Sequence, residues 1–357
     1  MTPIYFENED VITQRLKALY EGAGYAAYKI RKFEEYALYL DNRSFLSDEH
    51  IITFTDQNGS LLALKPDVTL SIVKNRRATQ GHSEKLYYRE TVYRYDKHAG
   101  QYREINQMGL ELLGDVTVTE ELEILELALT SLSALSANYR LTLSHMGLVN
   151  GILTGLGLSP SQKEEAIGAI GSKNVDGLNA ILARVGASEE VQRAFSRMLT
   201  VPADTCRYAA ALASTREAAQ AFEELFSLKE MLDALGYGDK VQIDLSVTQG
   251  TEYYNGLVFR GYAEGLSAPV LSGGRYDRLA QKFSPDTRAI GFAVYLGELL
   301  YHRAPTEYDT DVLLLQGEDT DPVTLLMRAR ELREEGQRVR VERRIPDGIR
   351  YRTLIKL

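Results

Sequence analysis

The sequence predicts an α+β fold in which antiparallel strands are combined with separate helices. Three observations support this class. Between residues 50 and 114, short segments rich in Thr, Ile, Tyr and Val are separated by turn residues such as "DQNGS", which is typical of antiparallel hairpins. Residues 146–240 carry helical patterns throughout. The tail, residues 308–357, has a strand–helix–strand order and forms a small α/β fragment.

The first 145 residues predict one helix, four strands and a second helix. Residues 8–22 form the first helix, where Asn8 can act as the N-cap and apolar residues recur on one face. A helix over residues 119–135 has acids in its first turn, where the helix dipole favours them. The four strands between these helices are "HIITFTD", "SLLALKP", "KLYYRETVYRYD" and "EINQMGLELLG".

The rest of the chain predicts a helical insertion, a return to the sheet and a tail. Ser159 can cap a helix of the insertion, with Pro160 at the first helical position. Strands return at "KVQIDLSVTQG" and "LVFRGYAEG". The segment "GGRYDRLAQKF" predicts a Gly turn that leads into a helix. The segment "AIGFAVYLGELLYHR" predicts a strand that runs into a helix. The tail predicts a strand at 312–315, a helix at 322–335 and a strand at 339–341. The expected domains are a core (1–145 and 241–305), an insertion (146–240) and a truncated α/β tail (306–357).

Composition excludes several classes of function. The chain has 357 residues, a formal net charge of -9 and a single cysteine, Cys206, which excludes an internal disulfide framework and favours a reducing, cytoplasmic compartment. Five histidines without ligand spacing argue against a metal cluster. We expect no signal peptide and no membrane span. The acidic balance weighs against nucleic acid as a partner, because phosphate binding needs clustered Lys and Arg.

Two segments supply candidate polar ligands for a small zwitterion. In "LKPDVTL", Asp67 and Thr69 could accept hydrogen bonds from an ammonium group, although Pro, Asp and Thr are also common in a β-turn or at the start of a strand. In the paired strands, Gln107 and Glu111 point to one face, which Arg94 of the neighbouring strand could share. The alternative is an ordinary solvated sheet face.

Three tyrosines are candidate pocket walls. In "EYYNG", Tyr253 and Tyr254 are expected on opposite faces of a strand, so that one packs in the core and the other can stack on a flat ligand. In "GGRYD", Tyr276 follows two glycines that allow close backbone approach to a ligand. Each tyrosine taken singly is more often a packing residue than a functional one.

Together these segments resemble the core of class II histidyl-tRNA synthetases. The order "LKPDVT", "VYRYD…QYREINQMGLELLG", a helical insert, "GTEYYNGLVF", "GGRYDRL" and "AIGFAVYLGEL" covers roughly residues 8–303. The resemblance implies an antiparallel sheet of six to seven strands flanked by helices, in a dimer. It also implies roles in histidine binding for Asp67, Thr69, Arg94, Gln107, Glu111, Tyr253, Tyr254 and Tyr276.

The departures from that family remove charges needed for adenylation. The resemblance places arginines where this chain has Gln101, Gln249 and Glu298. Each lost electrostatic donor can cost on the order of 10²–10³ in rate. We therefore expect no aminoacylation and no catalytic residues, cofactor or metal. In "GYAAYKIRKFEEY", Lys32 and Phe33 stand where the synthetase resemblance implies a proline at the dimer interface.

A histidine pocket without adenylation chemistry resembles a second family, the regulatory subunits of ATP phosphoribosyltransferase. This resemblance implies that the chain activates the short-form catalytic subunit, HisG, in the first step of histidine biosynthesis and permits feedback inhibition by histidine. It also implies a homodimer within a hetero-octamer. The alternatives are a histidyl-tRNA synthetase with a shortened tail, a synthetase paralogue and a stand-alone histidine sensor. The sequence leaves open whether histidine binds in this pocket or at the interface with HisG.

Overall fold

The computed structural model describes residues 9–46, 50–76, 83–96, 99–248, 253–300 and 307–357. The chain divides into two compact units, residues 1–303 and 304–357. No helix within the described ranges is long and apolar enough to cross a membrane. The larger unit contains all of the predicted site residues.

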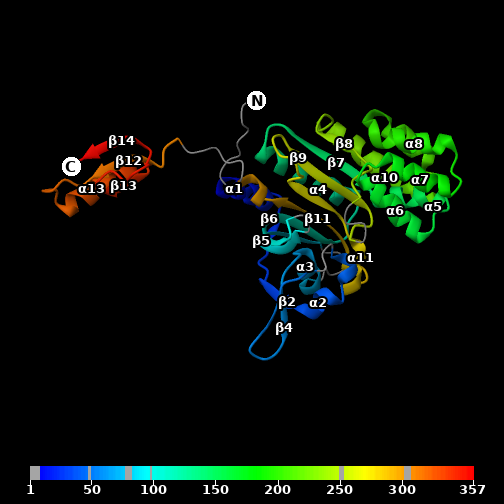
Figure 1. Ribbon diagram of the computed structural model, residues 1–357, viewed down its shortest axis with the longest axis horizontal. Helices are drawn as coiled ribbons and strands as arrows, with labels where there is room; N and C mark the ends of the chain where they lie inside the picture. The colour runs from blue at the N-terminus through cyan, green and yellow to red at the C-terminus, as the bar shows by residue number, and fades with distance from the viewer. Residues whose placement is uncertain (1–8, 47–49, 77–82, 97–98, 249–252, 301–306) are drawn as a thin grey trace. The chain divides into compact units, whose positions relative to one another are not determined.

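The described part of the larger unit is built on an eight-stranded sheet with the order β1-β5-β6-β11-β10-β9-β7-β8 (Figure 1). The five central pairings are antiparallel, as predicted, whereas the edge strands β1 and β8 pair in parallel with β5 and β7. The expected antiparallel sheet of six to seven strands therefore omitted the two short parallel edges. The strands are β1 (Ala26–Ala27), β5 (Glu84–Asp96), β6 (Gln101–Gly114), β7 (Tyr139–His145), β8 (Val241–Ile243), β9 (Leu257–Ala263), β10 (Leu271–Arg275) and β11 (Arg288–Tyr295).

One face of this sheet is covered by α1 (Glu9–Gly22) and α4 (Val118–Leu135), which share the main apolar core with the strands. Helix α4 begins at a capping box, in which Glu120 accepts a hydrogen bond from the Thr117 backbone N–H at 2.8 Å. The Tyr20 hydroxyl of α1 lies 3.0 Å from that of Ser131 of α4. Both helices lie where the sequence predicted them; Asn8, the expected cap of α1, lies outside the described residues.

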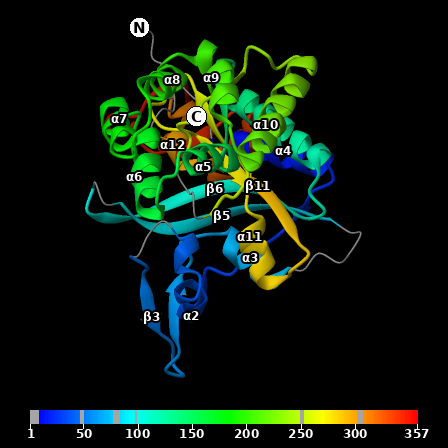
Figure 2. The same ribbon diagram turned by 90° about the vertical axis from the view of Figure 1, so that its right-hand side faces the viewer.

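The other face of the sheet carries smaller elements and a second apolar core (Figure 2). A three-stranded sheet with the order β2-β4-β3 packs there. The elements are β2 (Phe33–Glu35), α2 (Tyr36–Leu40), η1 (Arg43–Phe45), β3 (Thr53–Thr55), β4 (Leu61–Leu64), α3 (Thr69–Asn75) and α11 (Asp277–Phe283). Helix α3 corrects the expectation of a β-turn or strand start at "LKPDVTL". A bend at Pro66 leads into a helix that begins at Thr69, and Asp67 accepts the Leu70 backbone N–H in its first turn.

The insertion is a helical body attached beside β7 and β8. Helices α5 and α10 approach closely, since a Cβ on Gly151 would lie 2.8 Å from the Ala218 Cβ. Ser159 is the N-cap of helix α6 and Pro160 is its first residue, as predicted. The elements are α5 (Met146–Gly155), α6 (Pro160–Gly171), α7 (Val175–Arg184), α8 (Glu189–Thr200), η2 (Pro202–Asp204), α9 (Thr205–Leu212) and α10 (Arg216–Ala234).

The smaller unit is a parallel three-stranded sheet with one helix. Its elements are β12 (Thr310–Leu315), α13 (Pro322–Glu334), β13 (Val339–Glu342) and β14 (Tyr351–Lys356), and the strand order is β13-β12-β14. The first three elements match the predicted tail. Strand β14 was not predicted, although "YRTLIK" combines β-branched and aromatic residues in the way that strands do.

Candidate functional site

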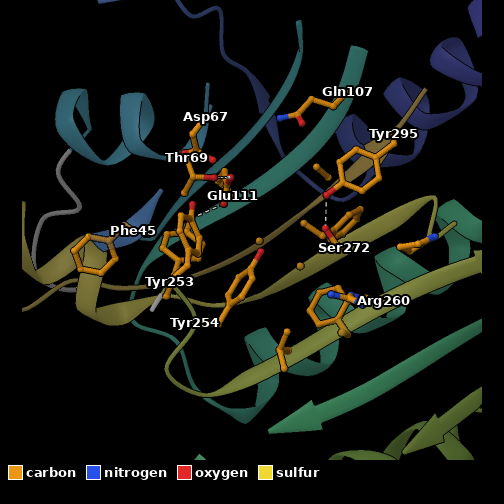
Figure 3. A pocket seen from close by; sticks show the side chains of 18 of the residues that line it. Phe45, Asp67, Thr69, Gln107, Glu111, Tyr253, Tyr254, Arg260, Ser272 and Tyr295 are labelled. Atoms are coloured by element: carbon orange, nitrogen blue, oxygen red, sulfur yellow. Dashed lines mark hydrogen bonds between the residues drawn. The ribbon is translucent and has the colours of Figure 1, made fainter. Parts of the chain in front are cut away.

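A pocket of about 430 Å³ opens on the sheet face that carries α3 and α11. This volume lies within the range of small-molecule sites. Figure 3 shows side chains from α3, β6, β10 and β11 converging on it. All eight residues expected to bind a ligand line this pocket: Asp67, Thr69, Arg94, Gln107, Glu111, Tyr253, Tyr254 and Tyr276.

The long hairpin β5–β6 explains why three of these residues meet. In its register Arg94 pairs with Arg103, Glu90 with Gln107 and Leu86 with Glu111. Cross-strand partners share a face and alternate residues along a strand share a face, so Arg94, Gln107 and Glu111 point the same way. The face is not solvated: Gln107 is 4% exposed and Glu111 is 2% exposed. The alternative of a solvated sheet face is therefore wrong.

Glu111 is the central polar group of the pocket. The Thr69 hydroxyl donates a hydrogen bond to its Oε1 at 2.5 Å, and the Tyr276 hydroxyl donates to its Oε2. Burial raises the pKa of Glu111 to about 8, against the opposing effect of these two hydrogen bonds, and the nearby Asp67 adds to the rise. Thr69 therefore donates to Glu111, and the lone pairs of its hydroxyl oxygen can still accept a hydrogen bond from an ammonium group, as the sequence suggested. A buried carboxyl of this kind favours a ligand that brings a positive charge or an N–H donor.

Asp67 and Arg94 form the second polar pair. Arg94 Nη2 lies 3.6 Å from Asp67 Oδ2, and Arg94 Nε donates to the Pro66 carbonyl at 2.8 Å. Burial raises the pKa of Asp67 while Arg94 opposes that rise. Arg94 therefore serves at least partly to hold the start of α3 against β5.

Three tyrosines form an aromatic wall. The ring centroids of Tyr253 and Tyr254 are 4.9 Å apart, and those of Tyr253 and Tyr276 are 5.6 Å apart. The expectation that Tyr253 and Tyr254 occupy opposite faces of a strand is wrong, because β9 begins only at Leu257. Without strand alternation, both side chains can line the same pocket. Burial raises the pKa of all three hydroxyls, which keeps them protonated as hydrogen-bond donors.

Glycines make room for this constellation. The "GG" of "GGRYD", expected as a turn, instead lies inside β10. A Cβ on Gly274 would lie 2.7 Å from the Tyr254 ring, and one on Gly291 of β11 would lie 2.0 Å from Glu111 Oε2. These positions accept no larger residue while the tyrosine and the carboxylate keep their places.

The comparisons with known proteins agree on one fold. A family model described as histidyl-tRNA synthetase matches residues 1–299. A crystal structure of an ATP phosphoribosyltransferase regulatory subunit/histidyl-tRNA synthetase from Bacillus halodurans superimposes with a TM-score of 0.82 at 24% identity, covering 98% of this chain and 93% of that one. The HisG:HisZ ATP phosphoribosyltransferase complex from Thermotoga maritima gives a TM-score of 0.64 at 18% identity, over 81% and 97% of the chains. The class II synthetase fold is thereby confirmed.

The decisive match is to a curated relative. The ATP phosphoribosyltransferase regulatory subunit of Moorella thermoacetica is 32% identical over 92% of this chain and 86% of its own length. This chain belongs to that family. The predicted regulatory, non-catalytic role in histidine biosynthesis is therefore confirmed.

Two of the three positions where the synthetase resemblance implies arginines lie within the described residues of this regulatory subunit. Gln101 is exposed at the start of β6, opposite Asp96. Glu298 belongs to the short helix α12 (Gly297–Leu300). Gln249 lies outside the described residues. Gln101 is not among the described residues that line the pocket.

The pocket also contains residues that were not predicted from the sequence. Arg260, Ser272 and Tyr295 line its far side, where Ser272 and Tyr295 are joined by a hydrogen bond between their hydroxyls (Figure 3). A signal was present in "LVFRGYA", since an arginine inside an otherwise apolar strand is unusual. Of the residues near this strand, only Tyr253 and Tyr254, which precede it, were predicted to contact a ligand.

Proposed function

We propose that this regulatory subunit binds histidine in the described pocket and passes that signal to a short-form catalytic subunit, HisG. The observation that carries the proposal is the buried arrangement of Glu111, Thr69 and Tyr276 beside a tyrosine wall. A carboxyl and protonated hydroxyls suit the two nitrogens of an imidazole ring, and Asp67 and Gln107 suit an ammonium group. The eight predicted residues keep their assigned roles as part of this proposal.

The proposed partner follows from relatives. The Thermotoga maritima neighbour is a complex of HisG with HisZ. We infer the same kind of pairing for this chain, with a homodimer of regulatory subunits inside a hetero-octamer. Mass measurement of the mixed complex tests the stoichiometry, and a monomeric regulatory chain within the complex would overturn it.

Regulation through this pocket requires that histidine bind the active and inactive forms of the complex with unequal affinity. A ligand with equal affinity for both forms shifts neither population. Coupling energies of about 1–3 kcal/mol are typical, and they correspond to roughly 5- to 150-fold changes in affinity. The coupling is reciprocal, so binding HisG must change the histidine affinity of this chain by the same factor.

The test mixes the purified chain with a short-form HisG. We expect a complex on gel filtration, raised turnover, and inhibition by histidine. Glu111→Ala and Tyr254→Ala should each raise the histidine concentration needed for inhibition by at least about tenfold. The first removes a hydrogen-bond partner of the ligand, and the second removes an aromatic ring that packs against it. Glu223→Ala, on the exposed face of α10, is the control. Complex formation with unchanged inhibition in both pocket variants would place the histidine site elsewhere.

A further inference from the structure

Two residues of the segments "EYYNG" and "GGRYD" have no place among the proposed ligand contacts. Asn255 and Arg275 are not among the described residues that line the pocket. They join the two segments, because the Asn255 backbone N–H donates to the Arg275 carbonyl at 3.0 Å. Gly256 lies against the Arg275 side chain, since a Cβ there would be 3.2 Å from the Arg275 Cδ. Arg275 therefore contacts the segment that carries the first two wall tyrosines and directly precedes the third, Tyr276.

The Arg275 guanidinium is held by two acids from different helices. Its Nη1 donates to Glu121 Oε1 of α4 at 2.9 Å, and its Nε donates to Asp277 Oδ2 of α11 at 2.8 Å. The side chains of Arg275, Glu121 and Asp277 are 19%, 10% and 12% exposed. Partly buried charges are screened less than surface charges, and the planar fork of an arginine fixes the direction of each bond. Arg275 therefore ties the end of β10 to both helices.

Arg275 and Tyr276 lie on opposite faces of the sheet. Arg275 pairs with Ile290 in the register of β10 and β11, and Ile290 belongs to the apolar core that α4 shares with the strands. Tyr276, one residue later, belongs to the second core on the other face, where its hydroxyl donates to Glu111. The ion pairs of Arg275 therefore fix the backbone next to Tyr276 from the side of the sheet that faces away from the pocket.

Asp277 fixes the backbone on the other side of Tyr276. Its Oδ1 accepts the Ala289 backbone N–H at 3.0 Å, and the Tyr276 backbone N–H donates to the Ala289 carbonyl at 2.8 Å. The second oxygen of Asp277 receives the Arg275 Nε. Tyr276 thus stands between two charged residues that are bonded to each other and held by β11 and α4. This arrangement restricts where the Tyr276 hydroxyl can lie, and a donor that is ordered before binding costs less to order in the complex.

We propose that Arg275 is a positioning residue of this pocket. Through its ion pairs with Glu121 and Asp277, Arg275 sets the place of the Tyr276 hydroxyl and thereby the affinity for the ligand. This role rests on the proposed histidine site. It gives a reason for the arginine and the aspartate on either side of the tyrosine in "GGRYD". Histidine affinity then depends on groups on the α4 side of the sheet, opposite to the pocket.

The test measures histidine affinity by calorimetry on the full chain, with circular dichroism of each variant to show that it is folded. Arg275→Gln should weaken histidine binding by about 5- to 30-fold, the size expected of a residue that acts without contacting the ligand. Arg275→Lys should lose less, because it keeps the charge without the planar fork. Glu121→Gln should also lose less, because Asp277 still holds the guanidinium. If Arg275→Gln does not fold, wild-type affinity in a folded Glu121→Gln protein would overturn the role.

A double-mutant cycle separates positioning from a general loss of stability. Tyr276→Phe removes the hydroxyl that Arg275 places, so adding Arg275→Gln to it should weaken binding by less than about threefold. A purely structural role would lower the denaturant midpoint and leave the two losses of affinity multiplicative. Multiplicative losses, or wild-type affinity in Arg275→Gln, would overturn the role of Arg275 while the histidine site stands.

Lys85→Gln and Glu123→Gln are the matched controls. Lys85 Nζ lies 2.7 Å from both carboxylate oxygens of Glu123, so this pair also joins α4 to the sheet. Lys85 pairs with Leu112, which lies in the core on the α4 side. Both variants should leave histidine affinity unchanged, and a loss equal to that of Arg275→Gln would also overturn the proposal. If wild type binds no histidine, the proposed histidine site itself fails, and this role fails with it.

Discussion

The Tyr276 hydroxyl donates a hydrogen bond to the Glu111 carboxylate from 165 positions away in the sequence. Tyr276 is the residue immediately before α11, and Glu111 lies near the C-terminal end of β6. The contact therefore closes the pocket between the sheet and the helix that covers it. It also places a titratable carboxyl, 2% exposed, where a ligand would lie.

Glu111 should make the stability of the ligand-free protein fall as pH rises. Its pKa is raised to about 8, so between the ordinary value of 4.5 and about 8 the folded state holds a proton that the unfolded state has lost. The free energy of unfolding then decreases with pH by up to about 1.4 kcal/mol per unit in this window. Glu111→Gln, which carries no titrating charge, should remove this part of the slope. Urea unfolding at about pH 5.5, 6.5 and 7.5, three values inside this window, measures the slope of unfolding free energy against pH.

Glu223→Gln serves as the control for that slope. Glu223 is exposed on α10, so its replacement should leave the pH dependence of wild type in place. Parallel slopes for wild type and Glu111→Gln would show that Glu111 is ionised in the folded protein throughout this range.

Gly291→Ala should destabilise the protein and close the pocket. Its Cβ would lie 2.0 Å from Glu111 Oε2 and 2.4 Å from the Leu110 carbonyl oxygen, and the backbone atom cannot move away cheaply. We expect a loss of about 1–3 kcal/mol or more and loss of histidine binding. Gly168→Ala is the matched control: Gly168 lies within α6 with open space at its Cβ, so the variant should gain up to about 1 kcal/mol. A Gly291→Ala protein as stable as wild type would contradict the packing described here.

The strands of the sheet and the residues that line one side of the pocket could be predicted from the sequence, because both follow from local patterns. Alternation along β5 and β6 is sufficient to place Arg94, Gln107 and Glu111 on one face. Glycines are harder to interpret. A "GG" pair is typical of a turn, but Gly273 and Gly274 lie in β10, because Phe292 and Tyr254 pack where their side chains would be.

The remaining differences between the predicted and the observed site have a non-local cause. The paired tyrosines Tyr253 and Tyr254 have β-type propensity, yet tertiary packing keeps them outside the strand and within one wall. Arg260 could be placed in the pocket only through the register of three further strands. No local pattern shows which strands will be neighbours when the connecting segments are as long as the helical insertion.

Lys65→Met should cost far more stability than a comparable change on the surface. Lys65 is fully buried, and its Nζ lies 2.5 Å from Glu90 Oε2, while Glu90 Oε1 accepts the Ile30 backbone N–H at 2.9 Å. Removing the cation leaves a mostly buried carboxylate unpaired, at a cost of about 3–5 kcal/mol. Lys17→Met breaks an exposed pair with Glu21, at 3.8 Å, and should change stability by less than about 1 kcal/mol. Denaturant midpoints of the two variants give the comparison, and equal midpoints would refute it.

The chain should not catalyse histidine-dependent exchange of pyrophosphate into ATP, and restoring one arginine should not change that. Gln101, Gln249 and Glu298 stand where the synthetase resemblance places positive charge. With each donor worth on the order of 10²–10³ in rate, a variant such as Gln249→Arg still lacks two and remains about 10⁴–10⁶ below an active enzyme. Radiolabelled pyrophosphate exchange, run beside an active histidyl-tRNA synthetase, measures the difference. Exchange would first be expected in the triple variant Gln101→Arg/Gln249→Arg/Glu298→Arg. Exchange above background in wild type or in Gln249→Arg would mean that the pocket retains adenylation chemistry through other groups, with Arg94 and Arg260 the first to replace.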